Sequence, residues 1–214
     1  MKIDFIVKND LVKDIRTFTE YDDVDWDPNL FPDFSSNSFP LEVILRTEFS
    51  IMDKFYLRKY FNKIHSNAKS ILEIGVNNSG EGSSTYCLLN SKKINTYYFG
   101  IDLNDKSYLN SENNNIFTLQ ENSSNIDDVM KFVRSKGIES FDFIHIDGYH
   151  SINQVLDDWR YTEFLSDDGI IVMHDTNFHP GPKYFTEALN LNKFNLEKKC
   201  NHLFDYGISF ITKK

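Results

Sequence analysis

From Ser70 onward the chain alternates short β-rich runs with longer stretches of helical pattern. The strand-like runs are ILEIGV, YYFGID, IFTLQ, FDFIHID and GIIVMHD, and the helix-like stretches are STYCLLNS, NIDDVMKFVRSKG, SINQVLDDWRYTEFL and PKYFTEALN. A β-α unit repeated in this way is typical of a parallel sheet with helices on both faces. We therefore predict an α/β, Rossmann-like, doubly wound fold.

The two ends of the chain depart from this repetition. The runs FNLEKKC and GISFITKK predict an antiparallel C-terminal hairpin, which would complete a mostly parallel seven-stranded sheet. The first 45 residues are acidic and hold three of the five prolines without a clear period, so they predict an irregular arm or lid. A helix is expected around Glu48 to Ile64, and residues 46–214 form the predicted main domain.

Composition narrows the class of protein. A formal net charge of -9 argues against nucleic acid as a partner, because phosphate binding needs a basic face. No apolar run is long enough to span a membrane, and the amino-terminal residues lack a signal-type apolar segment, so a cytoplasmic protein without membrane contact is expected. Cys87 and Cys200 lie far apart and predict buried free thiols.

A glycine-rich turn follows the first strand of the repeat. Gly75, Gly80 and Gly82 let the backbone approach a ligand, and Ser83 or Ser84 can cap the next helix, whose first N–H groups suit a nucleotide-like ligand. The spacing GVNNSGEG is not GxGxxG, which disfavours NAD. A tight turn without a ligand stays an open alternative on this motif alone.

Polar groups at the next strand ends add to this turn. Asp102 ends YYFGID, where a carboxylate can accept hydrogen bonds from both ribose hydroxyls. Glu73 is an acid at the end of an apolar strand and needs donors or a cation. The run QENSS, which contains Asn122 and Ser123, offers short polar side chains for an adenine edge. Each residue alone can be a cap or a loop residue, but together they predict a nucleoside pocket across three strand ends.

Two later strands end in groups that can bind a metal. Asp147 and His150 follow FIHI, and His174 and Asp175 follow IIVM. Because ligands gather beyond the carboxyl ends of parallel strands, we expect these side chains to face one crevice. The alternatives are helix caps for the acids and a structural hydrogen-bonding role for His150. Asp157 and Asp158 are predicted to lie on a solvated helix face.

The motifs together resemble a known family. ILEIGVNNSGEGSST, GIDLND, QENSS, FDFIHIDGYHSINQVLDDW and LSDDGIIVMHDTNFHPGP are similar to successive motifs of class I S-adenosylmethionine-dependent methyltransferases. They most resemble the branch with metal-dependent sugar O-methyltransferases and cephalosporin-hydroxylase-like proteins. The resemblance covers about residues 70–182. It implies that S-adenosylmethionine is bound by the residues of the turn and of the second and third strand ends: Glu73, Gly75, Gly80, Ser83, Ser84, Asp102, Asn122 and Ser123.

The resemblance also implies a divalent metal, Mg²⁺ or Mn²⁺, held by Asp147, His174 and Asp175. His174 departs from the family, whose members often have an acid or Asn there, and imidazole suits transition metals better than magnesium. A cation at this place would lower the pKa of an acceptor hydroxyl, and Asp147 then belongs to the catalytic group. His150 is the first candidate for the base that removes the hydroxyl proton, and His179 is the second.

The predicted function is therefore an S-adenosylmethionine-dependent O-methyltransferase that acts on a saccharide or another small-molecule acceptor. One alternative is a methyltransferase for a catechol-like or other small-molecule diol, which the same metal geometry would serve. Another is a nucleoside-binding partner protein without catalysis. The aromatic-rich amino-terminal arm is compatible with a homodimer contact or a lid.

Overall fold

The computed structural model describes residues 56–57, 68–76, 83–177, 179–199 and 206–214. Its helices and strands follow the predicted order: β1 Ser70–Ile74, α5 Ser84–Ser91, β2 Tyr97–Asp102, η2 Ser107–Leu109, η3 Glu112–Asn114, β3 Ile116–Gln120, α6 Ile126–Arg134, β4 Phe141–Ile146, α7 Ile152–Trp159, η4 Arg160–Phe164, β5 Leu165–His174, α8 Pro180–Ala188, β6 Phe194–Lys199 and β7 Ile208–Lys213. The predicted arm, most of the helix expected around 48–64, Gly80, Gly82 and Cys200 lie outside the described residues.

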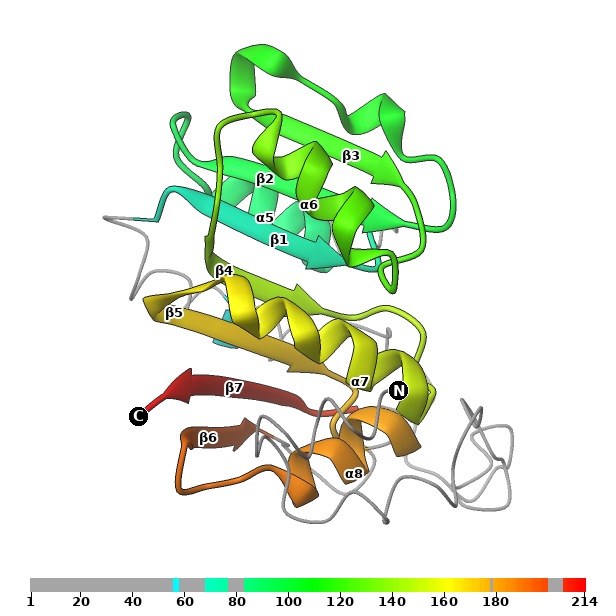
Figure 1. Ribbon diagram of the computed structural model, residues 1–214, viewed down its shortest axis with the longest axis vertical. Helices are drawn as coiled ribbons and strands as arrows, with labels where there is room; N and C mark the ends of the chain where they lie inside the picture. Colours follow the sequence, from blue (N-terminus) through cyan, green and yellow to red (C-terminus); the bar gives the residue numbers. More distant parts are fainter. Residues whose placement is uncertain (1–55, 58–67, 77–82, 178, 200–205) are drawn as a thin grey trace, which may run out of the picture.

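The strands form one seven-stranded sheet of order β3-β2-β1-β4-β5-β7-β6 (Figure 1). Strands β1 to β5 pair in parallel, whereas β7 is antiparallel to both β5 and β6. The predicted mostly parallel sheet with an antiparallel C-terminal hairpin is thus confirmed. The chain runs outward from β1 to β3 and then restarts at β4 on the other side. Such a switch point opens a crevice at the carboxyl ends of β1 and β4.

Side chains alternate between the two faces of the sheet, and each face has its own helical layer. In β1, Leu72 and Ile74 belong to the core formed with α6, α7 and α8, while Ile71 belongs to the core under α5. Figure 1 shows α6, α7 and α8 in front of the sheet and α5 behind it. Cys87 on α5 is buried, as predicted. Among the described residues, no helix combines the length and apolar character needed to cross a membrane.

The prediction of a solvated helix face at Asp157 and Asp158 is wrong, because these residues are only 4% and 0% exposed. The loop between β3 and α6 covers this side of α7. There Ser124 donates a hydrogen bond to Asp157 Oδ2 at 2.8 Å, and Ser123 donates one to Asp158 Oδ1 at 2.7 Å. Hydroxyl donors from a distant part of the sequence thus replace the water that the helical pattern suggested.

Gly75 sits where the tips of β1 and β4 touch. Its φ of +82° is in the left-handed region, and a Cβ added there would lie 2.0 Å from the carbonyl oxygen of Asp147. We expect Gly75→Ala to lower the free energy of unfolding by about 3 kcal/mol or more. The added Cβ forces the backbone at Gly75 away from that at Asp147, and alanine is also strained at a positive φ. Urea unfolding measures this.

Gly137→Ala is the matched control, since its φ is +79° but a Cβ there would meet nothing within 4 Å. Its expected cost is about 1 kcal/mol. Equal losses in the two variants would contradict the clash.

Candidate active site at the carboxyl ends of the strands

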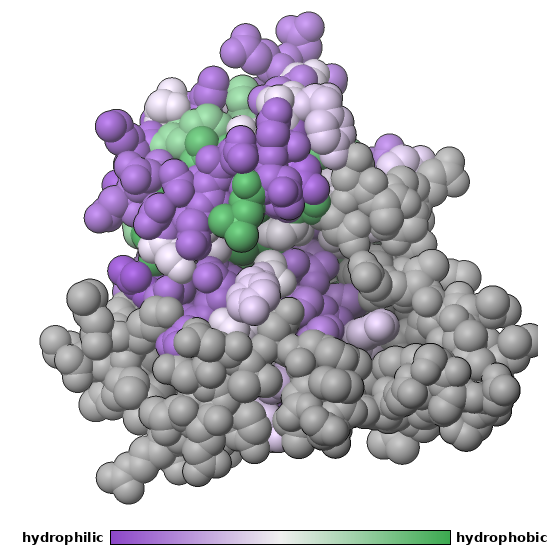
Figure 2. Space-filling model, turned by 90° about the vertical axis from the view of Figure 1, so that its right-hand side faces the viewer, coloured by the Kyte–Doolittle hydropathy of each residue, from purple (hydrophilic) through white to green (hydrophobic). Residues whose placement is uncertain are grey.

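A cavity of about 630 Å³ lies beyond the carboxyl ends of the parallel strands. Figure 2 looks onto this end of the sheet, where hydrophilic residues surround a few hydrophobic ones. The cavity is lined by most of the predicted site residues, namely Gly75, Asp102, Asn122, Ser123, Asp147, His150, His174, Asp175 and His179. Gln154 and Tyr206 also line it, and sequence reasoning missed both.

Asp102 organises the part of the cavity between β1 and β2. Its Oδ2 accepts a hydrogen bond from the backbone N–H of Val76 at 3.0 Å, and its Oδ1 accepts one from that of Asn104 at 2.8 Å. The carboxylate therefore fixes both turns that border it and keeps lone pairs for further donors. Leu103, beside it in the cavity wall, is 64% exposed. An apolar side chain next to an acceptor suits a nucleoside, with the base on Leu103 and the ribose on Asp102.

Glu73 does not line the cavity. It is fully buried on the α5 side of the sheet, where its oxygens accept hydrogen bonds from Ser84 at 2.7 Å and Thr85 at 2.8 Å, as well as from Tyr98. His145 Nδ1 lies 3.1 Å from the same carboxylate. Burial, followed by the Glu73 carboxylate, raises the pKa of Tyr98 well above its usual value, so this hydroxyl stays a donor. These donors explain how an acid is accommodated at the end of an apolar strand.

Ser83 and Ser84 also lie behind the first turn rather than on the cavity wall. Ser83 is the N-cap of α5 and accepts a hydrogen bond from the backbone N–H of Tyr86. Ser84 donates to Glu73, as described above. Both are fully buried. Of the eight residues predicted to bind the cofactor, Gly75, Asp102, Asn122 and Ser123 face the cavity, three support the turn from behind, and Gly80 lies outside the described residues.

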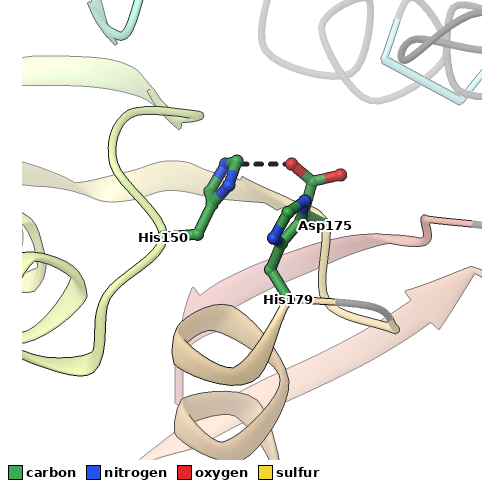
Figure 3. A group of neighbouring side chains, drawn as sticks. All are labelled: His150, Asp175 and His179. Atoms are coloured by element: carbon green, nitrogen blue, oxygen red, sulfur yellow. Dashed lines mark ion pairs between the residues drawn. The ribbon is translucent and has the colours of Figure 1, made fainter. Parts of the chain in front are cut away.

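The tips of β4 and β5 bring two acids and two histidines together. His174 Nδ1 lies 3.3 Å from Asp147 Oδ1 and 3.2 Å from Asp175 Oδ1. The other oxygen of Asp175 is 2.9 Å from His150 Nε2 (Figure 3). Asp175 has a φ of +60°, a backbone conformation uncommon for residues other than glycine and a recurring feature of functional sites. This turn places the Asp175 carboxylate between the two imidazoles.

Contacts from α8 and β7 hold the histidine loops. The backbone N–H of Gly181 donates to the carbonyl oxygen of His150 at 3.1 Å, so the start of α8 rests on the loop after β4. His179, the N-cap of α8, thereby comes to lie beside His150, with ring centroids 4.1 Å apart. Figure 3 shows both rings next to Asp175. On its other side His179 stacks on Tyr206 at 6.1 Å.

Strong electrostatic coupling follows from this packing. Burial alone would lower the pKa of His174, but the Asp175 and Asp147 carboxylates hold it well above its usual value. Burial likewise opposes ionisation of Asp147, whose pKa is nevertheless lowered to about 2 by His174 and by the hydrogen bond from His150. The pKa of Asp175 is also well below its ordinary range, since His174 and His150 outweigh its burial. At neutral pH the two acids are ionised and share the proton of His174.

The donor geometry fits a divalent cation. Asp147, His174 and Asp175 form one group of three potential ligands, and His150, Asp175 and His179 form another. Neighbouring ligands at right angles, each about 2.1 Å from an octahedral ion, lie about 3.0 Å apart. The separations of 3.2 and 3.3 Å from His174 Nδ1 to the two carboxylates are close to this value. Metal binding there requires His174 to release its shared proton.

Asp158, which the helical pattern assigned to a solvated face, is a buried acid next to the cavity wall. Its Oδ1 accepts hydrogen bonds from Ser123 at 2.7 Å and from Gln154 Nε2 at 2.9 Å. Its Oδ2 is buried and has no hydrogen-bond partner in the part of the chain that the structure describes. Burial raises the pKa of Asp158 to about 7, against the lowering effect of these two hydrogen bonds. A buried acid with a perturbed pKa directly behind a cavity wall is a marker of functional sites.

This pKa predicts a pH-dependent stability. An unfolded Asp titrates near pH 3.9, so between about pH 4 and pH 7 the folded chain binds the proton of Asp158 while the unfolded chain does not. The free energy of unfolding therefore falls as the pH rises through this window, and Asp158 accounts for about 2 to 3 kcal/mol between pH 5 and pH 8. We expect Asp158→Asn to be more stable than the wild type at pH 8, with the advantage shrinking at pH 5. Urea unfolding at the two pH values measures this difference in the free energy of unfolding. The same difference at both pH values would contradict the raised pKa of Asp158.

Comparison with known proteins places the fold. Residues 72–176 match a family described as a methyltransferase domain. None of the curated proteins matches the sequence. Among solved structures, MycE from the mycinamycin biosynthetic pathway, in complex with Mg, S-adenosylhomocysteine and mycinamycin VI, is 18% identical over 84% of this chain and 53% of its own, with a TM-score of 0.56. The chain thus spans about half the length of the MycE chains.

Two further structures are similar at comparable levels. CalS11, a TDP-rhamnose 3'-O-methyltransferase of calicheamicin biosynthesis, is 11% identical over 83% of this chain and 88% of its own, with a TM-score of 0.57. An rRNA methylase from Streptococcus thermophilus is 13% identical over 79% and 98%, with a TM-score of 0.52. At these identities the likeness concerns the fold. Together with the family match and the seven-stranded sheet, it identifies residues 72–176 as a class I S-adenosylmethionine-dependent methyltransferase domain.

Proposed function

We propose that the chain is an O-methyltransferase that binds a divalent metal and transfers the methyl group of S-adenosylmethionine to a hydroxyl of a saccharide. One observation carries the proposal: a single cavity joins Asp102 and the polar end of β3 to the Asp147, His174 and Asp175 group. A nucleoside-binding half thus opens directly onto a cation-binding half. A protein that only binds nucleosides has no need for the second half.

The cofactor is held by the first half of the cavity. Asp102 accepts hydrogen bonds from the ribose, Asn122 and Ser123 lie by the base, and Gly75 lets the methionine part approach the backbone. Glu73, buried beside Gly75, joins the end of β1 to the start of α5 by accepting a hydrogen bond from Ser84. The methyl group is then directed toward the tips of β4 and β5, where the acceptor binds.

The acceptor is prepared by the second half. Asp147, His174 and Asp175 would hold the cation, which would lower the pKa of the acceptor hydroxyl and fix a vicinal diol. His150 is the base that takes the hydroxyl proton. The His150 side chain is 20% exposed at the cavity, whereas that of His174 is only 2% exposed. Asp175 orients the His150 ring, because Asp175 Oδ2 lies 2.9 Å from His150 Nε2. His179 lies beside His150 and is the second candidate.

The donor set predicts which metal is preferred. His174 supplies a nitrogen where an all-oxygen site would favour Mg²⁺, so Mn²⁺ is expected to bind about tenfold more tightly or better. Isothermal titration of the metal-free protein with each ion measures this ratio. His174→Asp should lower the ratio of the Mn²⁺ affinity to the Mg²⁺ affinity, because it replaces a nitrogen ligand with an oxygen ligand. If this variant leaves the ratio unchanged, His174 is not a ligand.

The acceptor class is tested by incubating the protein with labelled S-adenosylmethionine and Mn²⁺ against nucleotide sugars, glycans, catechols and an rRNA fragment. Transfer to sugars supports the proposal. Transfer to catechols alone supports the small-molecule diol alternative, and transfer to RNA would overturn the expectation that nucleic acid is not a partner. Tight binding of S-adenosylhomocysteine without transfer to any acceptor points to a nucleoside-binding partner protein. Binding of NAD in its place would overturn the cofactor assignment.

A further inference from the structure

The wall of the cavity between β3 and α7 contains a hydrogen-bond network with a fixed direction. Gln154 lines the cavity, and its Nε2 donates both to Ser123 Oγ at 2.9 Å and to Asp158 Oδ1 at 2.9 Å. Ser123 in turn donates its hydroxyl to Asp158 at 2.7 Å. Both hydrogens of the Gln154 amide are therefore used inside the wall. The carbonyl oxygen of the same amide keeps its acceptor capacity.

Ser124 lies within hydrogen-bond distance of that oxygen, at 3.3 Å, and leaves it at least one lone pair. The Ser124 hydroxyl has one hydrogen, and it lies 2.8 Å from Asp157 Oδ2 but 3.3 Å from Gln154 Oε1. The shorter, charge-assisted bond to Asp157 is the stronger one. Gln154 Oε1 is thus an acceptor that this wall can offer to a ligand, beside the oxygens of Glu121 and Asn122, which also line the cavity.

Asp158 fixes the orientation of the Gln154 amide whether Asp158 is protonated or ionised. Its Oδ1 accepts two hydrogen bonds, whereas its buried Oδ2 has no partner among the residues described. A proton on the acid therefore sits on Oδ2 and leaves Oδ1 an acceptor. A reversed Gln154 amide would bring two oxygens together at Asp158, at the cost of a buried unpaired acceptor. Asp158 consequently holds the amide in one orientation without reaching the cavity itself.

We propose that Asp158 is a positioning residue that makes the base-binding wall a hydrogen-bond acceptor through Gln154, and that the chain thereby selects an amino-purine over a keto-purine. The exocyclic amine of adenine donates to Gln154 Oε1. A keto group at the same place presents oxygen to oxygen. This inference rests on the proposed binding of the cofactor, whose base lies by Ser123 in the same wall.

The test compares S-adenosylhomocysteine with S-inosylhomocysteine, in which the amine is replaced by a keto group, by calorimetry on the full chain. The wild type is expected to prefer the adenosyl compound by about tenfold or more, the range of one unpaired buried hydrogen bond. Asp158→Asn keeps an acceptor at Oδ1 and should keep the preference. Asp158→Ala frees the amide to rotate and should bring the ratio close to one.

Two further variants keep the test informative if Asp158→Ala does not fold. Gln154→Met removes the acceptor and should weaken binding of the adenosyl compound without weakening that of the inosyl compound. Glu163→Gln is the control and should leave the ratio unchanged, because Glu163 is an exposed acid in η4, directly after α7, and does not line the cavity. Equal binding of the two compounds to the wild type, or a ratio unaffected by Asp158→Ala and Gln154→Met, overturns the inference while the cofactor assignment stands. Failure of the wild type to bind either compound overturns both.

Discussion

Replacing Asp175 with asparagine is expected to lower turnover by about 10³-fold, because the loss of a charged ligand removes most of the several kcal/mol that a metal ion contributes to such a reaction. Asn tolerates the left-handed conformation that Asp175 adopts at a φ of +60°, so the backbone does not have to change. The substitution also removes the negative charge that holds the His174 proton and orients His150. Calorimetry with Mn²⁺ should show weakened metal binding in parallel with the kinetic loss.

A chelator gives an independent check on the same group. It should lower the turnover of the wild type toward that of Asp175→Asn and leave the turnover of the variant almost unchanged, since the contribution of the metal is already lost in the variant. Asp168→Asn is the control, because Asp168 is an exposed acid near the other end of the same strand, β5. The metal mechanism would be abandoned if the chelator left the turnover of the wild type unchanged.

The second large effect is expected at Asp102. Asp102→Ala removes a charged acceptor for two ribose hydroxyls and should weaken binding of S-adenosylhomocysteine by about 100-fold. Part of this loss is indirect, because the carboxylate also accepts from the backbone N–H groups of Val76 and Asn104. Asp102→Asn keeps one acceptor oxygen and should fall between the wild type and the alanine variant. Calorimetry with S-adenosylhomocysteine measures all three proteins.

Asp105→Ala is the matched control for this loss. Asp105 also accepts a backbone hydrogen bond, from Ser107 at 2.8 Å, and lies in the same loop but is exposed and does not line the cavity. The affinity of Asp105→Ala for S-adenosylhomocysteine should stay within about twofold of that of the wild type. A similar loss in both variants would mean that Asp102 acts by holding the loop and does not contact the ribose.

The fold and half of the site could be predicted because both depend on local patterns. Alternation of β-rich and helical stretches predicts a parallel sheet, and the strand ends of such a sheet meet at one edge. Asp102 is the last residue of an apolar strand, and Asp147 and Asp175 each directly follow one, so their convergence needs no further information. His179 was a weaker candidate, since it reaches the site through the packing of α8 on the loop of His150.

The remaining groups depend on contacts between distant segments, which the sequence pattern does not reveal. Asp158 looked like a residue of a solvated helix face, and it is buried because Ser123, 35 residues earlier, covers it. Gln154 lies on the same network, and its periodicity gives no sign of this role. Glu73 was expected at the cofactor, whereas the structure turns its side chain toward Tyr98 and α5. A signal was present in Glu73 itself, since an acid in an apolar strand needs buried donors.

The position of β7 in the sheet has a consequence for the order in which a newly made chain matures. β7 lies between β5 and β6, and its pairing aligns His174 with Ile208, while the backbone of Asn177 bonds to Tyr206. Residues 206–211 therefore have to leave the ribosome before the tip of β5 is held in place. The tips of β1, β2 and β3, which we propose bind the nucleoside, do not depend on this segment, because their strands pair among themselves and with β4. Since a nascent chain can use only contacts already synthesised, we expect the proposed nucleoside-binding half to form first and the proposed metal-binding half last.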